Sequence, residues 1–241
     1  PNSDLNPGAI IALSPALSGG QKAVYNSWGP GRYDPHFNLD GVNGPVVIPP
    51  AYGLLGTNSI TYTGDGANIA YWNLYVGVTQ MHGHGTFADS RLGLNVQNPP
   101  DLISSKLEAL QAYQLSLQTP APAAGSFDPV AAQRGLAVFQ GAGRCATCHV
   151  GSLLTDANTR LHDPAEVVSE PEPNGVPSYA SRSATGKYRT TPLRGLLRHP
   201  PYFHNGIAGT LEAVVDLYDT RKGLSLTPEQ KADLVEYLKS L

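Results

Sequence analysis

Long apolar runs and a charge excess of either sign are both absent from this sequence of 241 residues. No apolar stretch approaches the roughly 20 residues that a helix needs to cross a bilayer, so we expect no membrane span. The 16 lysines and arginines face 19 aspartates and glutamates, and the formal net charge is −3. This balance lacks the basic excess of nucleic-acid-binding proteins, so no nucleic-acid partner is expected.

Cysteine and methionine are equally scarce. The two cysteines, Cys145 and Cys148, cannot build a disulfide framework, and Met81 is the single methionine. The chain starts at Pro1 without a methionine or a signal peptide. We therefore expect it to begin within a domain.

Glycine and proline, by contrast, are plentiful. The 26 glycines and 21 prolines stay below the roughly 25–30% of residues that would indicate disorder. This composition predicts a folded protein with short helices and long loops.

The two cysteines form part of one motif, Cys145-Ala146-Thr147-Cys148-His149. C-x-x-C-H is the attachment signature of c-type haem. Two thiols at this spacing can add to the two vinyl groups on one porphyrin edge, and the adjacent His149 is then placed under the iron as the proximal ligand. The motif therefore predicts one covalently bound haem c.

Other uses of a C-x-x-C pair are weaker here. A zinc site needs further ligands at short spacing, and the sequence has no third cysteine. A redox dithiol of the thioredoxin type needs a βαβ setting, whereas the flanks are helical and rich in glycine. A structural disulfide or dithiol remains the alternative to haem.

Helix start signals flank the motif. Asp128-Pro129 is an N-cap followed by proline and predicts a helix that continues to Gln140. Thr227-Pro228-Glu229-Gln230 is a capping box that predicts a last helix, with apolar residues at a spacing of three or four. Amphipathic helices are also predicted over 102–117 and 211–218.

A stretch rich in proline and alanine, residues 119–127, predicts a linker between two units. The first unit, 1–118, has no C-x-x-C-H of its own, and the second, 128–241, contains the haem motif. A faint repeat relates them, because Gly53-Leu54-Leu55 and the turn at 61–66 have the order and spacing of Gly195-Leu196-Leu197 and the turn at 201–206. The first unit is therefore expected to be the back half of a second haem domain.

Three stretches together resemble the bacterial di-haem cytochrome c peroxidase and MauG superfamily. They are the motif at 145–149, Tyr188-Arg189-Thr190-Thr191-Pro192-Leu193-Arg194-Gly195, and the segment 201–206 leading to Thr210-Leu211-Glu212-Ala213-Val214-Val215-Asp216-Leu217-Tyr218. The resemblance implies an all-α fold with cytochrome c-like haem domains. It also implies a crossing of the helix before the motif with the last helix, where Gly135 and Tyr237 fit the contact.

The resemblance also implies roles for single residues. His204 matches a histidine near the propionates of the C-terminal haem, and Pro201 matches a residue whose carbonyl helps to hold calcium. Gln80 lies where the peroxidases have a catalytic glutamate and MauG has glutamine. The exchange removes a carboxylate that could move a proton, so efficient peroxidase turnover is in doubt.

The sixth ligand of the haem iron decides the chemistry. Methionine ligation within the second unit is excluded, because Met81 lies in the first. Tyr218 lies where the family places an axial Met or Tyr, and as a phenolate it would stabilise oxidised iron. His204 is the second choice, His199 and His162 are further donors, and packing in the core is the plain alternative for Tyr218.

Three more residues are candidates for haem contacts. Arg189 and Arg194 could pair with the propionates, since guanidinium groups suit carboxylates. Trp72 could lie between two haems and assist electron transfer, although aromatic residues are more often simply core.

These expectations describe a periplasmic or extracellular c-type haem redox protein, because haem c is attached outside the cytoplasm. Electron transfer would be coupled to peroxide or another oxidant, with a redox protein as partner. A second haem, completed by a preceding segment or another chain, and a calcium ion are further expectations. The alternative is a pure electron-transfer cytochrome subunit without substrate chemistry, and whether the chain is an enzyme stays open.

Overall fold

The computed structural model describes residues 4–241, so Pro1, on which the expectation of a mid-domain start depends, lies outside them. The α-helices are α1 (Pro7–Ile11), α2 (Gly19–Ser27), α3 (Phe37–Asp40), α4 (Ile69–Tyr75), α5 (Ser104–Ser116), α6 (Pro129–Gln140), α7 (Leu211–Lys222) and α8 (Pro228–Lys239). The strands are β1 (Arg32–Tyr33), β2 (Val46–Val47), β3 (Gly85–Asp89) and β4 (Leu94–Asn98).

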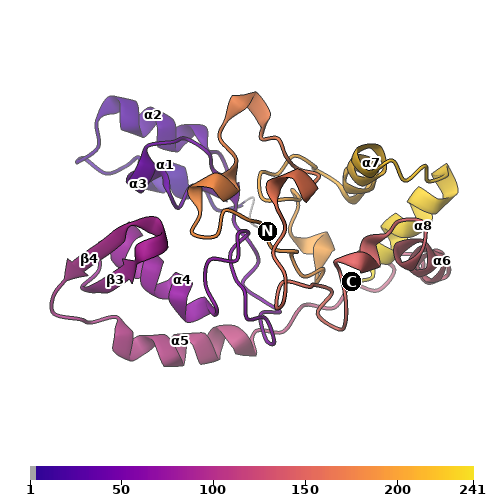
Figure 1. Ribbon diagram of the computed structural model, residues 1–241, viewed down its shortest axis with the longest axis horizontal. Coiled ribbons are helices and arrows are strands. Elements are labelled where there is room, and N and C mark those ends of the chain that lie inside the picture. Colours follow the sequence, from indigo (N-terminus) through magenta and orange to yellow (C-terminus); the bar gives the residue numbers. More distant parts are fainter. Residues whose placement is uncertain (1–3) are drawn as a thin grey trace.

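Short helical turns connect these elements. They are the π-turn η2 (Val76–Gln80) and the 3₁₀ turns η3 (Ser90–Leu92), η4 (Cys145–Thr147), η5 (Pro164–Glu166), η6 (Pro173–Gly175), η7 (Tyr179–Arg182) and η8 (Leu196–Arg198). Figure 1 shows α1 to α5 gathered on one side and α6 to α8 on the other, with long loops between them. Within the described chain, no helix combines the length and apolar character that crossing a membrane requires.

Helices dominate the fold, but the all-α expectation holds only in part. Strands β1 and β2 form one antiparallel pair, and β3 and β4 form an antiparallel hairpin with Phe87 opposite Val96. The side chains of β3 alternate between buried and exposed, and the inward-facing Phe87 packs on Tyr75 and Val78 of the neighbouring helical segment. A strand is favoured here because one face of a short segment is buried.

The predicted helix starts next to the haem motif are confirmed. Asp128 caps α6 by accepting hydrogen bonds from the backbone of Val130 and Ala131, and Thr227 forms the capping box of α8 with Gln230. Capping residues satisfy amide donors that have no partner inside the helix. Both helices therefore begin where the sequence predicts.

The close crossing of α6 with α8 is also confirmed. A Cβ atom at Gly135 would lie 2.0 Å from the Asp233 carbonyl oxygen and 2.8 Å from the Tyr237 Cβ. The ring of Tyr237 meets that of Phe139 edge to face, with 5.0 Å between centroids. Because only glycine permits this approach, the two helices lock into one apolar core with α7.

The helix predicted over 102–117 forms as α5, but none of its residues is buried. Asp101 caps its start by accepting from Ile103 and Ser104. Its main packing partner is α4, and Leu110 and Tyr113 stay exposed.

The two units share a backbone pattern in which equivalent positions are 142 residues apart. In each unit, an antiparallel bridge encloses a turn that contains one non-glycine residue and one glycine at positive φ. A helix capped by a short polar residue follows the turn. The equivalent pairs are Val46 and Tyr188, Gly53 and Gly195, Ile60 and Tyr202, Thr61 and Phe203, Gly64 and Gly206, and Asn68 and Thr210. The repeat in the sequence is therefore a repeat in backbone geometry, with Gly206 equivalent to Gly64.

The long segment 151–190 is tied to the first unit. Arg182 forms ion pairs with Asp34 and Asp40, and the side chains of Arg182 and Asp34 are 5% and 0% exposed. The Thr185 hydroxyl donates to the Thr63 carbonyl oxygen. The two units are therefore joined by buried polar contacts as well as by residues 117–128, which have no helix or strand.

Candidate functional site

The haem motif forms a single tight turn after α6. Arg144 adopts positive φ, and η4 follows, in which the His149 amide donates to the Cys145 carbonyl oxygen at 3.0 Å. Both cysteines are free and half-buried. Burial raises the pKa of the Cys145 thiol to about 11, so this thiol is protonated near neutral pH.

The imidazole of His149 is held in one tautomer. Its Nδ1 lies 2.9 Å from the Leu154 carbonyl oxygen, which can only accept, so Nδ1 carries the proton. Burial lowers the pKa of His149 and favours the neutral ring. The lone pair of Nε2 is then available to a metal ion, as a haem ligand requires.

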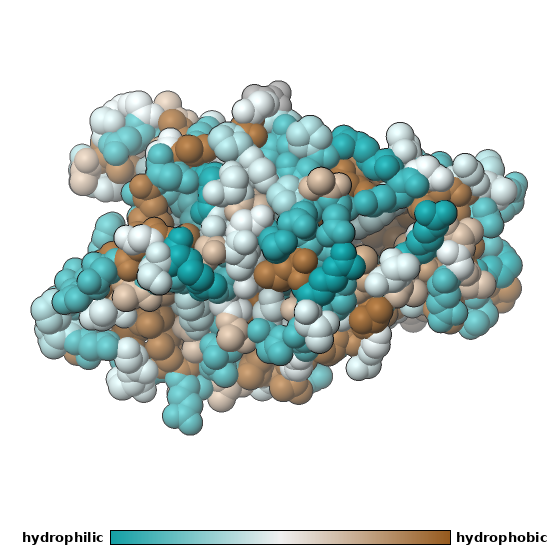
Figure 2. Space-filling model, in the orientation of Figure 1, coloured by the Kyte–Doolittle hydropathy of each residue, from teal (hydrophilic) through white to brown (hydrophobic). Residues whose placement is uncertain are grey.

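The cysteines and His149 line a cavity of about 510 Å³. This volume is within the range of sites for small molecules and cofactors. Both units contribute to its wall, the first through Val47, Ile48, Pro50 and Tyr62. In Figure 2, apolar residues lie in a hollow on the side of the molecule where Figure 1 labels α6, α7 and α8.

Tyr218 projects from α7 into the same cavity. Its ring lies 5.9 Å from that of Phe203, and its hydroxyl has no hydrogen-bond partner among the described residues. Burial, and then the proximity of Cys145 and Cys148, raise the pKa of the phenol above its usual value. The phenol is therefore neutral in the protein alone, and a bound metal ion would be needed to displace its proton.

Arg189 brings a positive charge to the cavity wall without an acidic partner. The side chain is buried, one terminal nitrogen donates to the Ser59 carbonyl oxygen at 2.6 Å, and Nε has no partner within residues 4–241. Burial lowers the pKa of Arg189 to about 10, so the group stays charged at neutral pH. Such a group favours an anionic ligand nearby.

His204 lines the cavity but is engaged elsewhere. Its Nε2 lies 2.5 Å from Glu172 Oε1, and its Nδ1 lies 3.4 Å from the Ser169 hydroxyl. Burial raises the pKa of Glu172, but the hydrogen bonds from His204 and Asn205 lower it by more, and the net pKa is below the usual value. Because its nitrogens already have these partners, His204 is poorly placed to bind iron.

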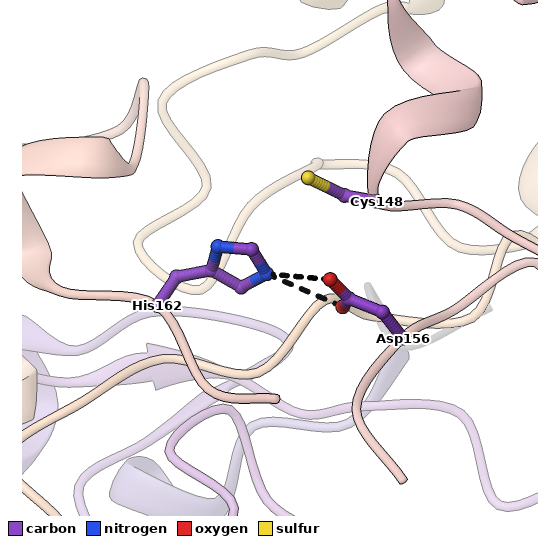
Figure 3. A group of neighbouring side chains, drawn as sticks. All are labelled: Cys148, Asp156 and His162. Carbon is purple, nitrogen blue, oxygen red and sulfur yellow. Dashed lines mark hydrogen bonds and ion pairs between the residues drawn. The ribbon is translucent and has the colours of Figure 1, made fainter. Parts of the chain in front are cut away.

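A second group of donor atoms surrounds Cys148. Ligand atoms of Cys148, Asp156 and His162 lie within 4.8 Å of one another, and Figure 3 shows the Asp156 carboxylate against the imidazole of His162. His162 Nε2 lies 3.0 Å and 3.2 Å from the two carboxylate oxygens. A thioether bond at Cys148 would remove its thiolate from this group, and of the other two residues His162 lines the cavity.

The remaining candidates lie outside the cavity. Arg194 donates to the carbonyl oxygens of Gly53 and Ser152, so it links segments of the backbone. Trp72 stacks on Tyr75 at 5.3 Å in the core of the first unit. The structure thus brings nine predicted residues together in one wall (Cys145, Cys148, His149, His162, Arg189, His199, Pro201, His204 and Tyr218).

Gln80 is held in a dense polar network. Its Nε2 donates to the Pro35 carbonyl oxygen at 3.0 Å and lies within hydrogen-bond distance of the hydroxyls of Thr79 and Tyr75. Its Oε1 accepts from the Tyr33 hydroxyl at 2.7 Å. The amide is therefore saturated by protein groups in this arrangement.

A row of rings connects Trp72 with the cavity. The centroid distances are 5.3 Å from Trp72 to Tyr75, 6.4 Å from Tyr75 to His36, 5.4 Å from His36 to Tyr179 and 6.0 Å from Tyr179 to His204. Sequence reasoning missed Tyr179, Glu170 and Glu172, which lie in a polar loop without periodicity. Tyr188 begins the stretch 188–195 that carries part of the family resemblance, but the sequence alone indicated no role for it.

Several known proteins are similar to part of this chain, although no protein-family model matches it. "Cytochrome-c peroxidase IdrP2" of Pseudomonas sp. (strain SCT) is 29% identical over 143 residues, covering 46% of this chain and 39% of its own. "Cytochrome-c peroxidase IdrP1" of the same strain is 30% identical over 148 residues, covering 45% and 39%. "Methylamine utilization protein MauG" of Methylorubrum extorquens is 33% identical over 124 residues, covering 46% and 34%.

The comparison with solved structures also finds a similar fold. It is that of a MauG-like protein associated with microbial copper homeostasis, with a TM-score of 0.54 and 22% identity, and the match covers 81% of this chain and 73% of that one. The chain spans about two fifths of the length of the curated relatives. These matches confirm the resemblance to the di-haem cytochrome c peroxidase and MauG superfamily.

Proposed function

From this relationship to the di-haem cytochrome c peroxidases and MauG, we propose that the chain is a c-type haem redox protein. Cys145 and Cys148 hold the porphyrin through thioether bonds, and His149 Nε2 is the proximal iron ligand. Electron transfer through this haem is coupled to peroxide or another oxidant, with a redox protein as partner. Because haem c is attached outside the cytoplasm, the location is the periplasm or the extracellular space.

One observation carries this proposal: the C-x-x-C-H turn opens on an apolar cavity in which the His149 tautomer leaves Nε2 available. Arg189 supports it, because its buried guanidinium lacks an acidic partner and haem propionates supply one. Cys145, Cys148, His149 and Arg189 thus fit the group in covalent chemistry, ligand type and charge.

Tyr218 is the sixth ligand in this proposal. Its hydroxyl has no protein partner, whereas His204 is bound to Glu172. When bound, haem supplies a reversible one-electron centre, and a phenolate ligand favours its oxidised form. Arg189 neutralises the propionates, while the apolar wall keeps water from the haem face.

The first unit has a second redox role in the proposal. A second haem would lie beside it, completed by a preceding segment or another chain, with Trp72 assisting electron transfer between the two. Gln80 would donate a hydrogen bond to bound peroxide there, which requires its amide to leave the Pro35 carbonyl oxygen, and the Pro201 carbonyl would help to hold calcium. Of these roles, the row of rings from Trp72 to the cavity supports that of Trp72.

A mass measurement of denatured holo-protein tests the attachment. A c-type haem adds its mass to the chain and survives extraction with acidified organic solvent. Cys148→Ala removes one thioether bond, so haem staining on a denaturing gel falls strongly. A band of normal intensity would refute the attachment at Cys148.

The ferric spectrum tests the sixth ligand. Tyr218→Phe removes the phenolate, so the visible and EPR spectra of the ferric protein change. Phe203→Leu, which alters only the ring beside Tyr218, leaves the ligand set unchanged and serves as control. An unchanged Tyr218→Phe spectrum assigns Tyr218 to packing.

The second candidate is a pure electron-transfer cytochrome subunit. The saturated hydrogen bonds of Gln80 favour it, because no amide group is left to bind peroxide. In that case every haem iron is six-coordinate and low-spin, and added peroxide leaves the spectrum unchanged.

A further inference from the structure

Two tyrosines of the cavity wall differ in the group that accepts their hydroxyl proton. The Tyr188 hydroxyl donates to Glu170 Oε1 at 2.5 Å. The Tyr202 hydroxyl donates to the Leu196 carbonyl oxygen at 3.0 Å. Both side chains line the cavity and are almost fully buried.

The difference matters when a tyrosine loses an electron. A phenol that gives up one electron becomes a strong acid, so its oxidation is favourable only if a nearby base takes the proton. A carboxylate is such a base, whereas a backbone carbonyl is not. Of these two tyrosines, only Tyr188 has a built-in proton acceptor.

Tyr188 is also rigidly placed. Its backbone exchanges two hydrogen bonds with His162, at 2.7 Å and 2.8 Å, and its ring lies 4.8 Å from that of His204. Glu170 Oε1 accepts a second hydrogen bond from the Ser178 hydroxyl at 2.6 Å. The phenol and the carboxylate are thus held in contact at the cavity wall.

At rest the proton belongs to the tyrosine. Burial, and then the hydrogen bond to Glu170, raise the pKa of Tyr188 above its usual value. The phenol therefore releases its proton only when it also loses an electron.

We propose that Tyr188 is an electron donor to the haem of this cavity and that Glu170 takes its phenol proton. The inference rests on the proposed haem function. An electron passes from Tyr188 to this haem after the haem has itself lost an electron to the second haem, where peroxide reacts. The O–H bond of Tyr188 breaks, a new O–H bond forms at Glu170 Oε1, and a neutral tyrosyl radical remains.

The step balances with peroxide as oxidant. One hydrogen peroxide takes two electrons and, from solvent, two protons, and gives two water molecules, so each turnover needs two one-electron transfers through Tyr188, one after the other. The partner redox protein then returns an electron to the radical, and Glu170 returns the proton. Tyr188 and Glu170 are restored together.

The experiment mixes ferric holo-protein with hydrogen peroxide, follows the haem by stopped-flow absorption and freezes samples for EPR. In the wild type, the haem spectrum changes and a tyrosyl signal forms. Tyr188→Phe abolishes the signal, and Tyr202→Phe keeps it. Glu170→Gln retains the hydrogen-bond acceptor but not the base, so radical formation slows by roughly 100-fold.

The outcomes separate this inference from the function on which it rests. If the haem reacts but no tyrosyl signal forms, or if the signal persists unchanged in Tyr188→Phe, the role of Tyr188 is wrong and the haem function stands. A normal rate in Glu170→Gln overturns the proton transfer. A haem spectrum that peroxide does not change overturns both the peroxide chemistry and this inference.

Discussion

The two units of this protein share one backbone pattern and fill it differently. Where the second unit has Arg189, His204 and Tyr218, the equivalent positions 142 residues earlier hold Val47, Tyr62 and Val76. The second unit supplies most of the wall of a cavity of about 510 Å³. In the first unit, Tyr75, Val78 and Phe87 form a closed core.

The comparison shows that the turns and helix caps determine the backbone of each unit, while a few side chains decide whether the unit can hold a cofactor. Positive φ at equivalent positions and capped helices recur in both units. The guanidinium of Arg189 and the imidazole of His204 occur only at the second set of positions, where Val47 and Tyr62 stand in the first. Changes that act on one unit and spare the other therefore test this division.

The largest effect is expected at the crossing of α6 and α8. Gly135→Ala places a methyl group 2.0 Å from the Asp233 carbonyl oxygen, so the helices must separate. We expect the free energy of unfolding to fall by about 3 kcal/mol or more. Thermal denaturation of the holo-protein measures the loss.

Gly20→Ala, in the first turn of α2, is the matched control in the other unit. A Cβ at Gly20 has no neighbour within 4 Å, so the change is expected to stabilise by about 0.5 kcal/mol. Equal effects of the two substitutions would contradict the account of the crossing.

A smaller loss of stability is expected at the polar network of the first unit. Gln80→Leu leaves the Tyr33 hydroxyl and the Pro35 carbonyl oxygen without their amide partner. The expected loss is about 2 kcal/mol. Urea denaturation measures it, and peroxide kinetics on the same variant show whether Gln80 also acts in a reaction.

Gln97→Leu is the control for this substitution, since Gln97 is exposed on β4. Its effect should stay within about 0.5 kcal/mol. If both variants lose the same stability, the network around Gln80 has no special part in the fold.

The acid side of the stability profile should depend on the pair of His204 and Glu172. The pKa of Glu172 in the folded protein lies below the usual value of 4.5, so folding is favoured by the pair above that pH. The contribution is lost as the pH falls through the folded pKa. Glu172→Gln therefore flattens the fall in melting temperature below about pH 4.5.

Glu108→Gln, at an exposed position of α5, tests whether the loss of any glutamate changes the melting temperature at acid pH in the same way. It should leave the slope of the acid limb unchanged. A flattened limb in this variant as well would assign the effect to net charge and not to the pair.

A substitution of Arg189 is expected to have the smallest effect on stability but a specific effect on the midpoint potential of the haem. Arg189→Leu removes a positive charge from the cavity wall, so oxidised iron becomes easier to form and the midpoint potential falls. Arg194→Leu should leave the potential unchanged, because Arg194 is engaged with Gly53 and Ser152. Potentiometric titration of both variants decides which arginine serves the propionates.

Local signals in the sequence predicted much of the second unit. The caps Asp128 and Thr227, the glycine at position 135 and the C-x-x-C-H motif act over a few residues, so their consequences can be read without the fold. The C-x-x-C-H motif predicts His149, guanidinium chemistry predicts Arg189 and family position predicts Tyr218, and the structure places all three in one cavity wall.

The remainder depends on contacts between distant segments. Tyr188 and Glu170 are 18 residues apart in a polar loop, and nothing in their neighbourhood indicates that they meet. The β3–β4 hairpin forms because Phe87 packs in the core of the first unit, and α5 has no buried residue although it packs on α4. Arg194 is the opposite case. Its guanidinium group suits a haem propionate, but in the structure it donates to the backbone carbonyl oxygens of Gly53 and Ser152.

The shared wall of the cavity has a consequence for assembly. Val47, Ile48, Pro50 and Tyr62 close a chamber whose covalent anchor belongs to the other half of the chain. In the proposed function, a haem attached at Cys145 and Cys148 would therefore contact both halves of the chain. An isolated C-terminal fragment would present the porphyrin face to solvent, and its colour and potential would report the loss of the earlier residues.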